Sequence, residues 1–104
     1  SCSRRMSGYF ETIIQVRGDK AEEGIEKIRS SSRKMQDRQN YISKVEKVTD
    51  GYDIYLSSNK ITENILKVLR ANYSLETKRS YELIGEKEGK KIYRNYVSAR
   101  IDED

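Results

Sequence analysis

The sequence predicts an α/β fold of the α+β kind, a two-layer sandwich in which two helices cover one face of a largely antiparallel sheet. The first observation behind this prediction is the order of hydrophobic patterns, because segments of strand period and helical period follow one another as β-α-β-β-α-β-β. The second is the length of 104 residues, which suits one hydrophobic core. The third is that a split β-α-β sandwich accommodates this order with short, right-handed connections.

The first strand and the first helix are separated by a clear change of period. From residue 9 to residue 17, apolar side chains alternate with polar ones, and Gly18 ends the run. Asp19 and Glu22 have the spacing of a capping box, so we expect a helix from about Lys20 to Asp37. Its inward stripe is expected to consist of Ala21, Ile25, Ile28, Ser32 and Met35. Core packing explains this stripe better than a groove for a partner.

The middle of the chain predicts a hairpin followed by a second helix. Asp50-Gly51 separates two runs of strand period, residues 41–48 and 52–56, and Asp-Gly in that position is a strong hairpin signal. Val45 and Val48 have opposite parity, so a bulge or a three-residue loop is needed to point both inward, and the register stays open. The helix is expected from Lys60 to about Asn72, with Leu66 off its apolar stripe.

The last third of the chain predicts a second hairpin. Its strands are expected at Thr77–Ile84 and Lys90–Ile101, joined by a loop over residues 85–89. In the final strand one face is expected to carry Tyr93, Val97, Ala99 and Ile101. Residues 8–101 are therefore expected to form a single α/β domain, followed by an acidic tail at residues 102–104.

Composition argues against an enzyme. The chain has no histidine and one cysteine, so it cannot supply a Ser-His or Cys-His nucleophile or a histidine-bound metal. Asp50 and Asp53 are conceivable metal ligands, but Asp50 before Gly51 is what a turn requires. An acylphosphatase-like reaction is disfavoured because no arginine lies in a glycine-bounded phosphate loop. No apolar run approaches the roughly 20 residues of a membrane span, so we expect a cytoplasmic protein with neither a membrane nor a small-molecule substrate as partner.

Positive charge points to a polyanionic partner. The balance is 21 Lys+Arg minus 17 Asp+Glu, or +4, and it is 21 minus 14, or +7, without the three acids of the tail. The candidate RNA-binding or ribosome-binding residues form two groups, one at the end of the first helix and one on the closing hairpin: Arg29, Arg33, Lys34 and Arg38, then Lys87, Lys90, Lys91 and Arg94. Helix-dipole stabilisation and protection of an edge strand explain the same groups without a partner. If the two groups face the same way, they form one electrostatic footprint.

Tyrosines suggest a second kind of surface. We expect four of them on the sheet face away from the helices, namely Tyr9, Tyr41, Tyr55 and Tyr96. Exposed aromatic rings on a sheet can stack on bases, or they can pack against a neighbouring domain. The signature of the RNA-recognition motif is not present, so that particular fold is not expected.

Three segments are similar in order and spacing to those of one protein family. They are Gly8–Arg17 preceded by Cys2, Asp50–Ser58 followed by a helix, and Gly89–Arg94 leading to Ile101. Over about Cys2 to Ile101, the chain resembles the nonsense-mediated-decay-three family, the export adaptors of the large ribosomal subunit, and in particular its archaeal relatives.

The resemblance implies a position and a function. Residues 1–7 would be the remnant of a preceding zinc module or a linker, with Cys2 as the last ligand of the zinc, so the intact protein would hold zinc and this chain no cofactor. The implied function is that of a noncatalytic module of a ribosome-associated adaptor, which binds rRNA or ribosomal proteins of the large subunit during late maturation or export. The alternative is a scaffold domain that packs its Tyr-rich sheet on a neighbouring domain.

Overall fold

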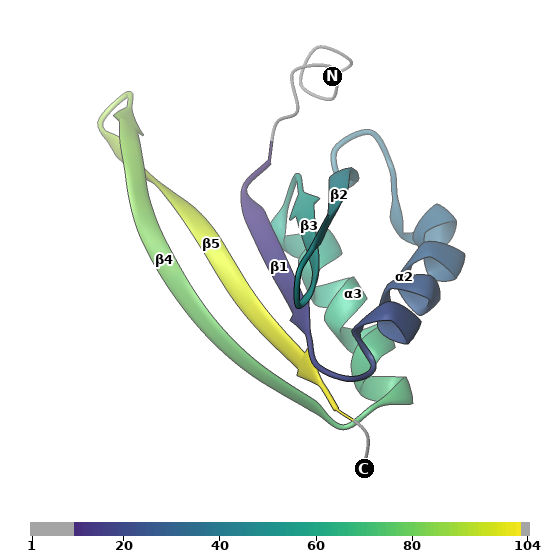
Figure 1. Cartoon of the computed structure of the whole chain (residues 1–104). Helices are drawn as coiled ribbons and strands as arrows, with labels where there is room; N and C mark the ends of the chain where they lie inside the picture. The colour runs from purple at the N-terminus through teal and green to yellow at the C-terminus, as the bar shows by residue number, and fades with distance from the viewer. Residues whose placement is uncertain (1–9, 103–104) are drawn as a thin grey trace.

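The strand and helix periods of the sequence produce a mixed sheet with two helices on one side of it (Figure 1). The computed structural model describes residues 10–102, with the side chain of Lys87 left aside. In chain order the elements are β1 (Thr12–Arg17), α2 (Ala21–Met35), β2 (Ile42–Val48), β3 (Gly51–Leu56), α3 (Asn59–Asn72), β4 (Leu75–Lys87) and β5 (Lys90–Ile101). The predicted fold class and element order are confirmed.

The sheet has the strand order β2-β3-β1-β5-β4. Only the central β1–β5 pair is parallel, and the other three pairings are antiparallel. Alternation places Ile14 and Val16 of β1 on the helix-covered face, where they are fully buried. The core between the layers consists of Ile14, Val16, Ala21, Ile25, Ile28, Ile54, Leu56, Ile61, Ile65, Leu66, Leu69, Val97, Ala99 and Ile101.

Both helices differ in detail from the pattern that predicted them. Lys20 is the N-cap of α2 without a side-chain cap, and its backbone N–H donates to the carbonyl of Ile101 at 3.0 Å, so the end of β5 takes the place of the expected capping box. In α3 the N-cap is Ser58, whose hydroxyl accepts a hydrogen bond from the N–H of Ile61. Leu66 is fully buried, contrary to the prediction, because α3 packs against α2 as well as the sheet.

A bulge settles the register of the first hairpin. The pairing of β2 with β3 shifts between Ile42 and Lys44, and this extra residue turns Val45 toward the core opposite Ile54. Val48 lies half-buried opposite Gly51 at the turn.

The second hairpin is longer than predicted. Residues 85–87 pair with β5 and do not form a loop, and the turn consists of Glu88 and Gly89, whose φ angles are 53° and 78°. Two positive φ values in a two-residue turn match the twist of long strands, which explains why pairing continues to the tip. A register shift between Leu83 and Gly85 absorbs one residue of β4.

The loop between α2 and β2 is organised by Asp37. Its Oδ1 accepts hydrogen bonds from the backbone N–H groups of Gln39 and Asn40, both at 2.8 Å, and from the side-chain amide of Asn40 at 3.1 Å. These bonds, the one from the Asn40 side chain foremost, hold the pKa of Asp37 below its ordinary value. Asn40 in turn accepts a hydrogen bond from the hydroxyl of Ser58, so the loop is tied to the start of α3.

Asp37→Ala is expected to destabilise the domain at neutral pH and to do so less in acid. Because the folded pKa is depressed, the carboxylate contributes stability that is present above the unfolded pKa of 3.8 and lost as pH falls through the folded pKa. Urea unfolding of the variant and the original protein, at neutral pH and below pH 3.8, measures this difference. Equal destabilisation at both pH values would show that the charge of Asp37 contributes nothing.

The second hairpin extends well past the central strand. β1 pairs with β5 only from Asn95 to Arg100, whereas β4 and β5 remain paired to the turn and project from the sheet (Figure 1). We call the projecting part, residues 81–94, the hairpin arm. Among the described helices, neither is long and apolar enough to cross a membrane.

Candidate functional site

The sheet face opposite the helices, here called the open face, carries a row of side chains across all five strands. The register places Lys44, Tyr55, Ile13, Tyr96 and Ser80 side by side, in that order from β2 to β4. Ile13 is only 9% exposed although no helix covers it, because a tyrosine of a neighbouring strand lies on each side. The register confirms the predicted positions of Tyr55 and Tyr96 on this face, because both lie beside Ile13.

Two cations and two aromatic rings form a continuous ladder on the open face. The ring of Phe10 meets Tyr55 edge to face, with ring centroids 4.8 Å apart. The guanidinium of Arg94 lies 4.2 Å from the centroid of Phe10, and the ammonium of Lys44 lies 4.6 Å from that of Tyr55. We call the set Arg94, Phe10, Tyr55 and Lys44 the cation–aromatic ladder. It holds two cationic groups over the open face, and Lys44 also forms an exposed salt bridge to Glu46 at 3.5 Å. Cations beside aromatic rings are suited to phosphate and base contacts.

Tyr55→Ala is expected to cost about 1–2 kcal/mol of folding stability, since it removes one aromatic pair and one cation–π contact. Tyr55→Phe keeps both ring contacts and is expected to cost less than about 0.5 kcal/mol. Chemical denaturation of the two variants provides the measurement. If the Phe variant lost as much as the Ala variant, the hydroxyl and not the ladder would be the stabilising group.

Two other arginines of the open face are occupied by local ion pairs. Arg17 forms a salt bridge to Asp53 at 2.8 Å and donates to the carbonyl of Tyr52 at 3.1 Å, which links β1 to β3. Arg100 donates to Asp102 at 2.7 Å, and this bond raises the pKa of Arg100 and lowers that of Asp102. These contacts serve the fold. Asp53 was considered above as a metal ligand, and its carboxylate is instead paired with Arg17.

The predicted basic group of the first helix lies on the helix layer. Arg29, Arg33, Lys34 and Arg38 are all exposed, and Arg33 and Lys34 occupy the last turn of α2. Arg29 contacts Glu26 at 3.4 Å, so its charge is partly compensated. Figure 1 shows this end of α2 on the right and the tip of the hairpin arm at the upper left.

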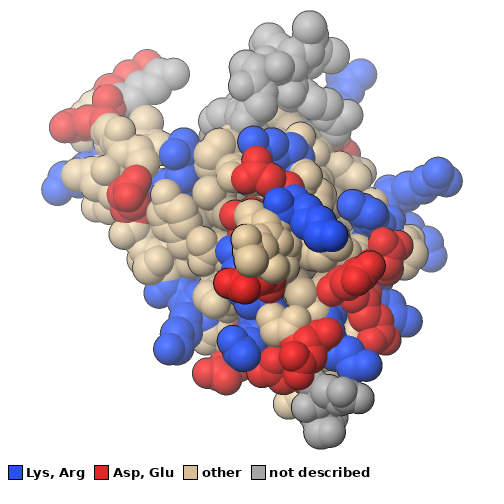
Figure 2. Space-filling view, in the orientation of Figure 1, with Lys and Arg blue, Asp and Glu red and all other residues tan. Residues whose placement is uncertain are grey.

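The predicted basic group of the hairpin is divided between the tip and the open face. Lys90 and Lys91 are exposed near the turn, and Arg94 is the half-buried first member of the ladder. The backbone of Lys87 pairs with that of Lys90. The two basic groups therefore lie apart and do not form one footprint. On the face shown in Figure 2, acidic and basic side chains are interspersed.

Two tyrosines and the cysteine that the sequence singled out are not on the described open surface. Tyr41 is not an exposed ring: it is 1% exposed, its backbone N–H donates to the Ser57 hydroxyl at 2.8 Å, and its carbonyl accepts from the Ser57 N–H at 3.0 Å. Cys2 and Tyr9 lie outside the described residues. Among residues 10–102, no group of three or more His, Cys, Asp or Glu side chains is placed to hold a metal ion.

The sequence pattern did not reveal that the hairpin arm exposes large apolar side chains. They are Tyr81, Leu83, Ile84, Ile92 and Tyr93, with exposed fractions of 40–68%. Tyr93 does share a face with Val97 and Ala99, as predicted, but the helices end before they reach it. This exposure follows from the length of the paired strands, which depends on the two-residue turn. A prediction of that turn would have been needed to expect it. Such a cluster on a projecting element is typical of an interaction surface.

Comparison with known proteins agrees with this architecture. The family model described as NMD3, second domain, matches residues 9–101. No curated protein matches the chain. The matched segment spans every helix and strand that the structure describes, and it contains the hairpin arm and all four members of the ladder. The chain therefore belongs to the NMD3 family, in which it corresponds to the second domain.

Proposed function

We propose that this domain is a noncatalytic docking module of a ribosome-associated adaptor, and that it binds the large ribosomal subunit through rRNA, ribosomal proteins or both during late maturation or export. Membership in the NMD3 family supports the proposal. The observation that carries it in this chain is the cation–aromatic ladder, which holds Arg94 and Lys44 over aromatic rings on a face that no helix covers.

The chemistry of the surface favours docking over catalysis. The carboxylates with shifted pKa values, Asp37 and Asp102, are exposed and are explained by hydrogen bonds within a loop and near the end of β5. A catalytic acid or base is instead tuned by burial or by a charge in a cleft. Fixed cations beside stacking surfaces bind a polyanion without any proton transfer.

Sedimentation with purified large ribosomal subunits over a salt series tests the proposal. We expect the domain to co-sediment at about 50 mM salt and to dissociate progressively toward about 200 mM, with a linear fall of log K against log salt concentration. Small subunits at equal concentration serve as the control for nonspecific RNA binding. Absence of co-sedimentation, or equal binding to both subunits, would contradict the proposal.

A protein-docking role for the open face is the second candidate function. The row of Tyr55, Ile13 and Tyr96 favours it, because this part of the face is flat and contains an aliphatic centre. Hydrogen exchange of an intact chain that includes the neighbouring domains would show protection of β1 and β3 relative to the isolated domain. Unchanged exchange would leave this candidate without support.

The proposal includes two features of the intact protein. Cys2 is proposed as a ligand of a zinc ion, together with ligands outside this sequence, and zinc content before and after Cys2→Ser in the full-length protein tests this. The working compartment is proposed to be the cytoplasm, which fluorescence imaging or fractionation of the full-length protein can check.

A further inference from the structure

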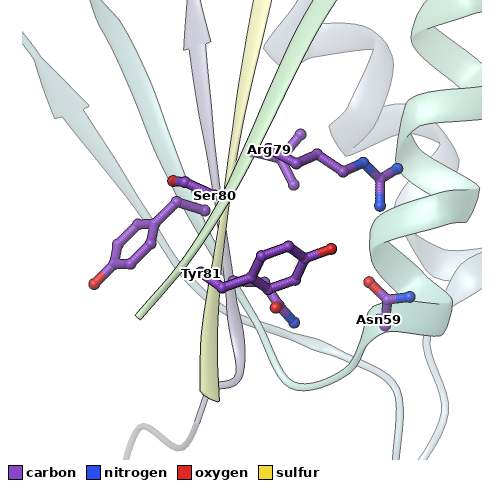
Figure 3. A pocket seen from close by; sticks show the side chains of 7 residues that line it. Asn59, Arg79, Ser80 and Tyr81 are labelled. Atoms are coloured by element: carbon purple, nitrogen blue, oxygen red, sulfur yellow. The ribbon is translucent and has the colours of Figure 1, made fainter. Parts of the chain in front are cut away.

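At the base of the hairpin arm, β4, β5 and the start of α3 line a pocket of about 220 Å³ on the helix side of the sheet. Four of its side chains matter here: Asn59 from α3, Arg79 and Tyr81 from β4, and Asn95 from β5. Figure 3 shows Arg79 and Tyr81 pointing toward α3, with Asn59 facing the ring of Tyr81, while Ser80 points to the other side of the sheet. The pocket is thus distinct from the ladder on the open face.

Polar groups in the pocket are available to a ligand. The side-chain amides of Asn59 and Asn95 form no hydrogen bond to another described residue, and each offers donors and an acceptor. Arg79 forms a salt bridge to Glu63, which holds its guanidinium beside α3. Tyr81 is 68% exposed, far more than a tyrosine that serves only the core. None of the pocket's lining residues is acidic.

The size of the pocket indicates what kind of group it accepts. Sites for whole small molecules usually measure about 300–1,000 Å³, so a space of about 220 Å³ suits one planar group of a larger molecule. The apolar surface continues from the pocket along the arm, because Leu83 and Tyr93 are directly opposite each other on the same face and are 54% and 49% exposed. A macromolecule that inserts one group can therefore also cover the arm.

We propose that this pocket binds one unpaired RNA base, stacked on the ring of Tyr81 and hydrogen-bonded at its edge by the amides of Asn59 and Asn95. This inference rests on the proposed ribosome-binding function and names the contact that recognises single-stranded RNA. Unstacked bases are bound in this way by aromatic rings and amide side chains, since every base has a flat face and an edge of donors and acceptors.

The charges around the pocket favour RNA over a peptide. Lys60 follows Asn59 in the first turn of α3, and Lys90 and Lys91 lie farther along the arm near its turn. None of the three forms a salt bridge with another described residue. The first turn of α3 contains no acidic residue, so its partial positive charge is not offset there. The phosphates on either side of an inserted base would lie in this field.

A short single-stranded RNA oligomer that contains 2-aminopurine provides the direct test. Stacking on Tyr81 is expected to quench its fluorescence, and Tyr81→Ala is expected to weaken binding about tenfold, whereas Tyr81→Phe, which keeps the ring, is expected to bind as the original protein does. Because Tyr81 is exposed, neither variant should change the thermal unfolding midpoint by more than a few degrees. Unaltered binding by Tyr81→Ala, or no quenching by the original protein, would overturn the inference.

Asn59→Asp separates recognition from stability. A carboxylate in the first turn of α3 is favourable to the helix, so this variant is expected to be at least as stable as the original protein. It is also expected to bind the oligomer more weakly, because the carboxylate repels phosphate and cannot donate to a base. Equal binding would contradict a role for this side chain in base recognition and would overturn the inference as stated.

Failure of this inference and failure of the proposed function are distinguishable on whole subunits. If large subunits bind Tyr81→Ala as tightly as the original protein, the base pocket is wrong and the ribosomal function stands. If they bind neither, the function is wrong, and the oligomer measurement still decides the pocket. A photoreactive benzoyl-phenylalanine in place of Leu83 should crosslink to rRNA, and a crosslink to a ribosomal protein alone would overturn the inference in favour of a protein partner.

Discussion

Gly51→Ala is expected to lower the stability of the domain by about 3 kcal/mol, which corresponds to a fall of about 15 °C in the unfolding midpoint. Gly51 begins β3 with a φ of 156°, in a region that side chains with a Cβ rarely adopt. A Cβ built at this position would lie 1.9 Å from the carbonyl oxygen of Val16, an atom of the neighbouring strand. Relief of this clash requires β1 and β3 to separate where Arg17 and Gly51 pair.

Two other glycines are matched controls for this prediction. Gly85 has no atom within 4 Å of an added Cβ and no positive φ, so Gly85→Ala is expected to be neutral or slightly stabilising. Gly89 has equal space but a φ of 78°, so Gly89→Ala should cost only the backbone strain, about 1 kcal/mol. Guanidinium unfolding of all three variants measures which of them loses the most stability. A Gly51→Ala protein within about 0.5 kcal/mol of the original would show that the strands can separate there without loss.

Local signals in the sequence were sufficient for the elements but not for their ends. The alternation of residues 9–17 and the Asp50-Gly51 turn each predicted an element that the structure contains. The expected loop over residues 85–89 was wrong, because a glycine among charged residues has the composition of a loop whether or not its backbone is paired. The burial of Tyr41 depends on its contact with Ser57, 16 residues later in the chain, which no local pattern contains.

The candidate surfaces depend on contacts that no local pattern contains. Phe10, Lys44, Tyr55 and Arg94 come from four separate parts of the chain, and they meet because β1 lies between β3 and β5 in the sheet. The order of strands in a sheet is set by the packing of the whole core. Composition could therefore predict that tyrosine, lysine and arginine form the binding surface. It could not predict which tyrosines are exposed or which cations share a face.

The double variant Lys90→Glu/Lys91→Glu is expected to weaken binding to large subunits by about 10- to 100-fold at low salt. Both side chains are exposed on the hairpin arm, where a change of charge affects the partner and not the core. Each cation that contacts a phosphate contributes about one to the slope of log K against log salt concentration, so we expect the slope to fall by about two. Tyr81→Ala, by contrast, should weaken binding with the slope unchanged, because stacking releases no counterion.

Arg33→Glu/Lys34→Glu is the matched control for that variant, since it changes the net charge by the same amount on the opposite side of the molecule. The last turn of α2 loses its favourable interaction with the helix dipole, which costs about 0.3–1 kcal/mol per residue and is measured separately by thermal unfolding. If the arm docks on rRNA, this control should retain most of the affinity and most of the salt slope. Equal losses in the two double variants would mean that overall charge, and not the projecting hairpin, drives association with the subunit.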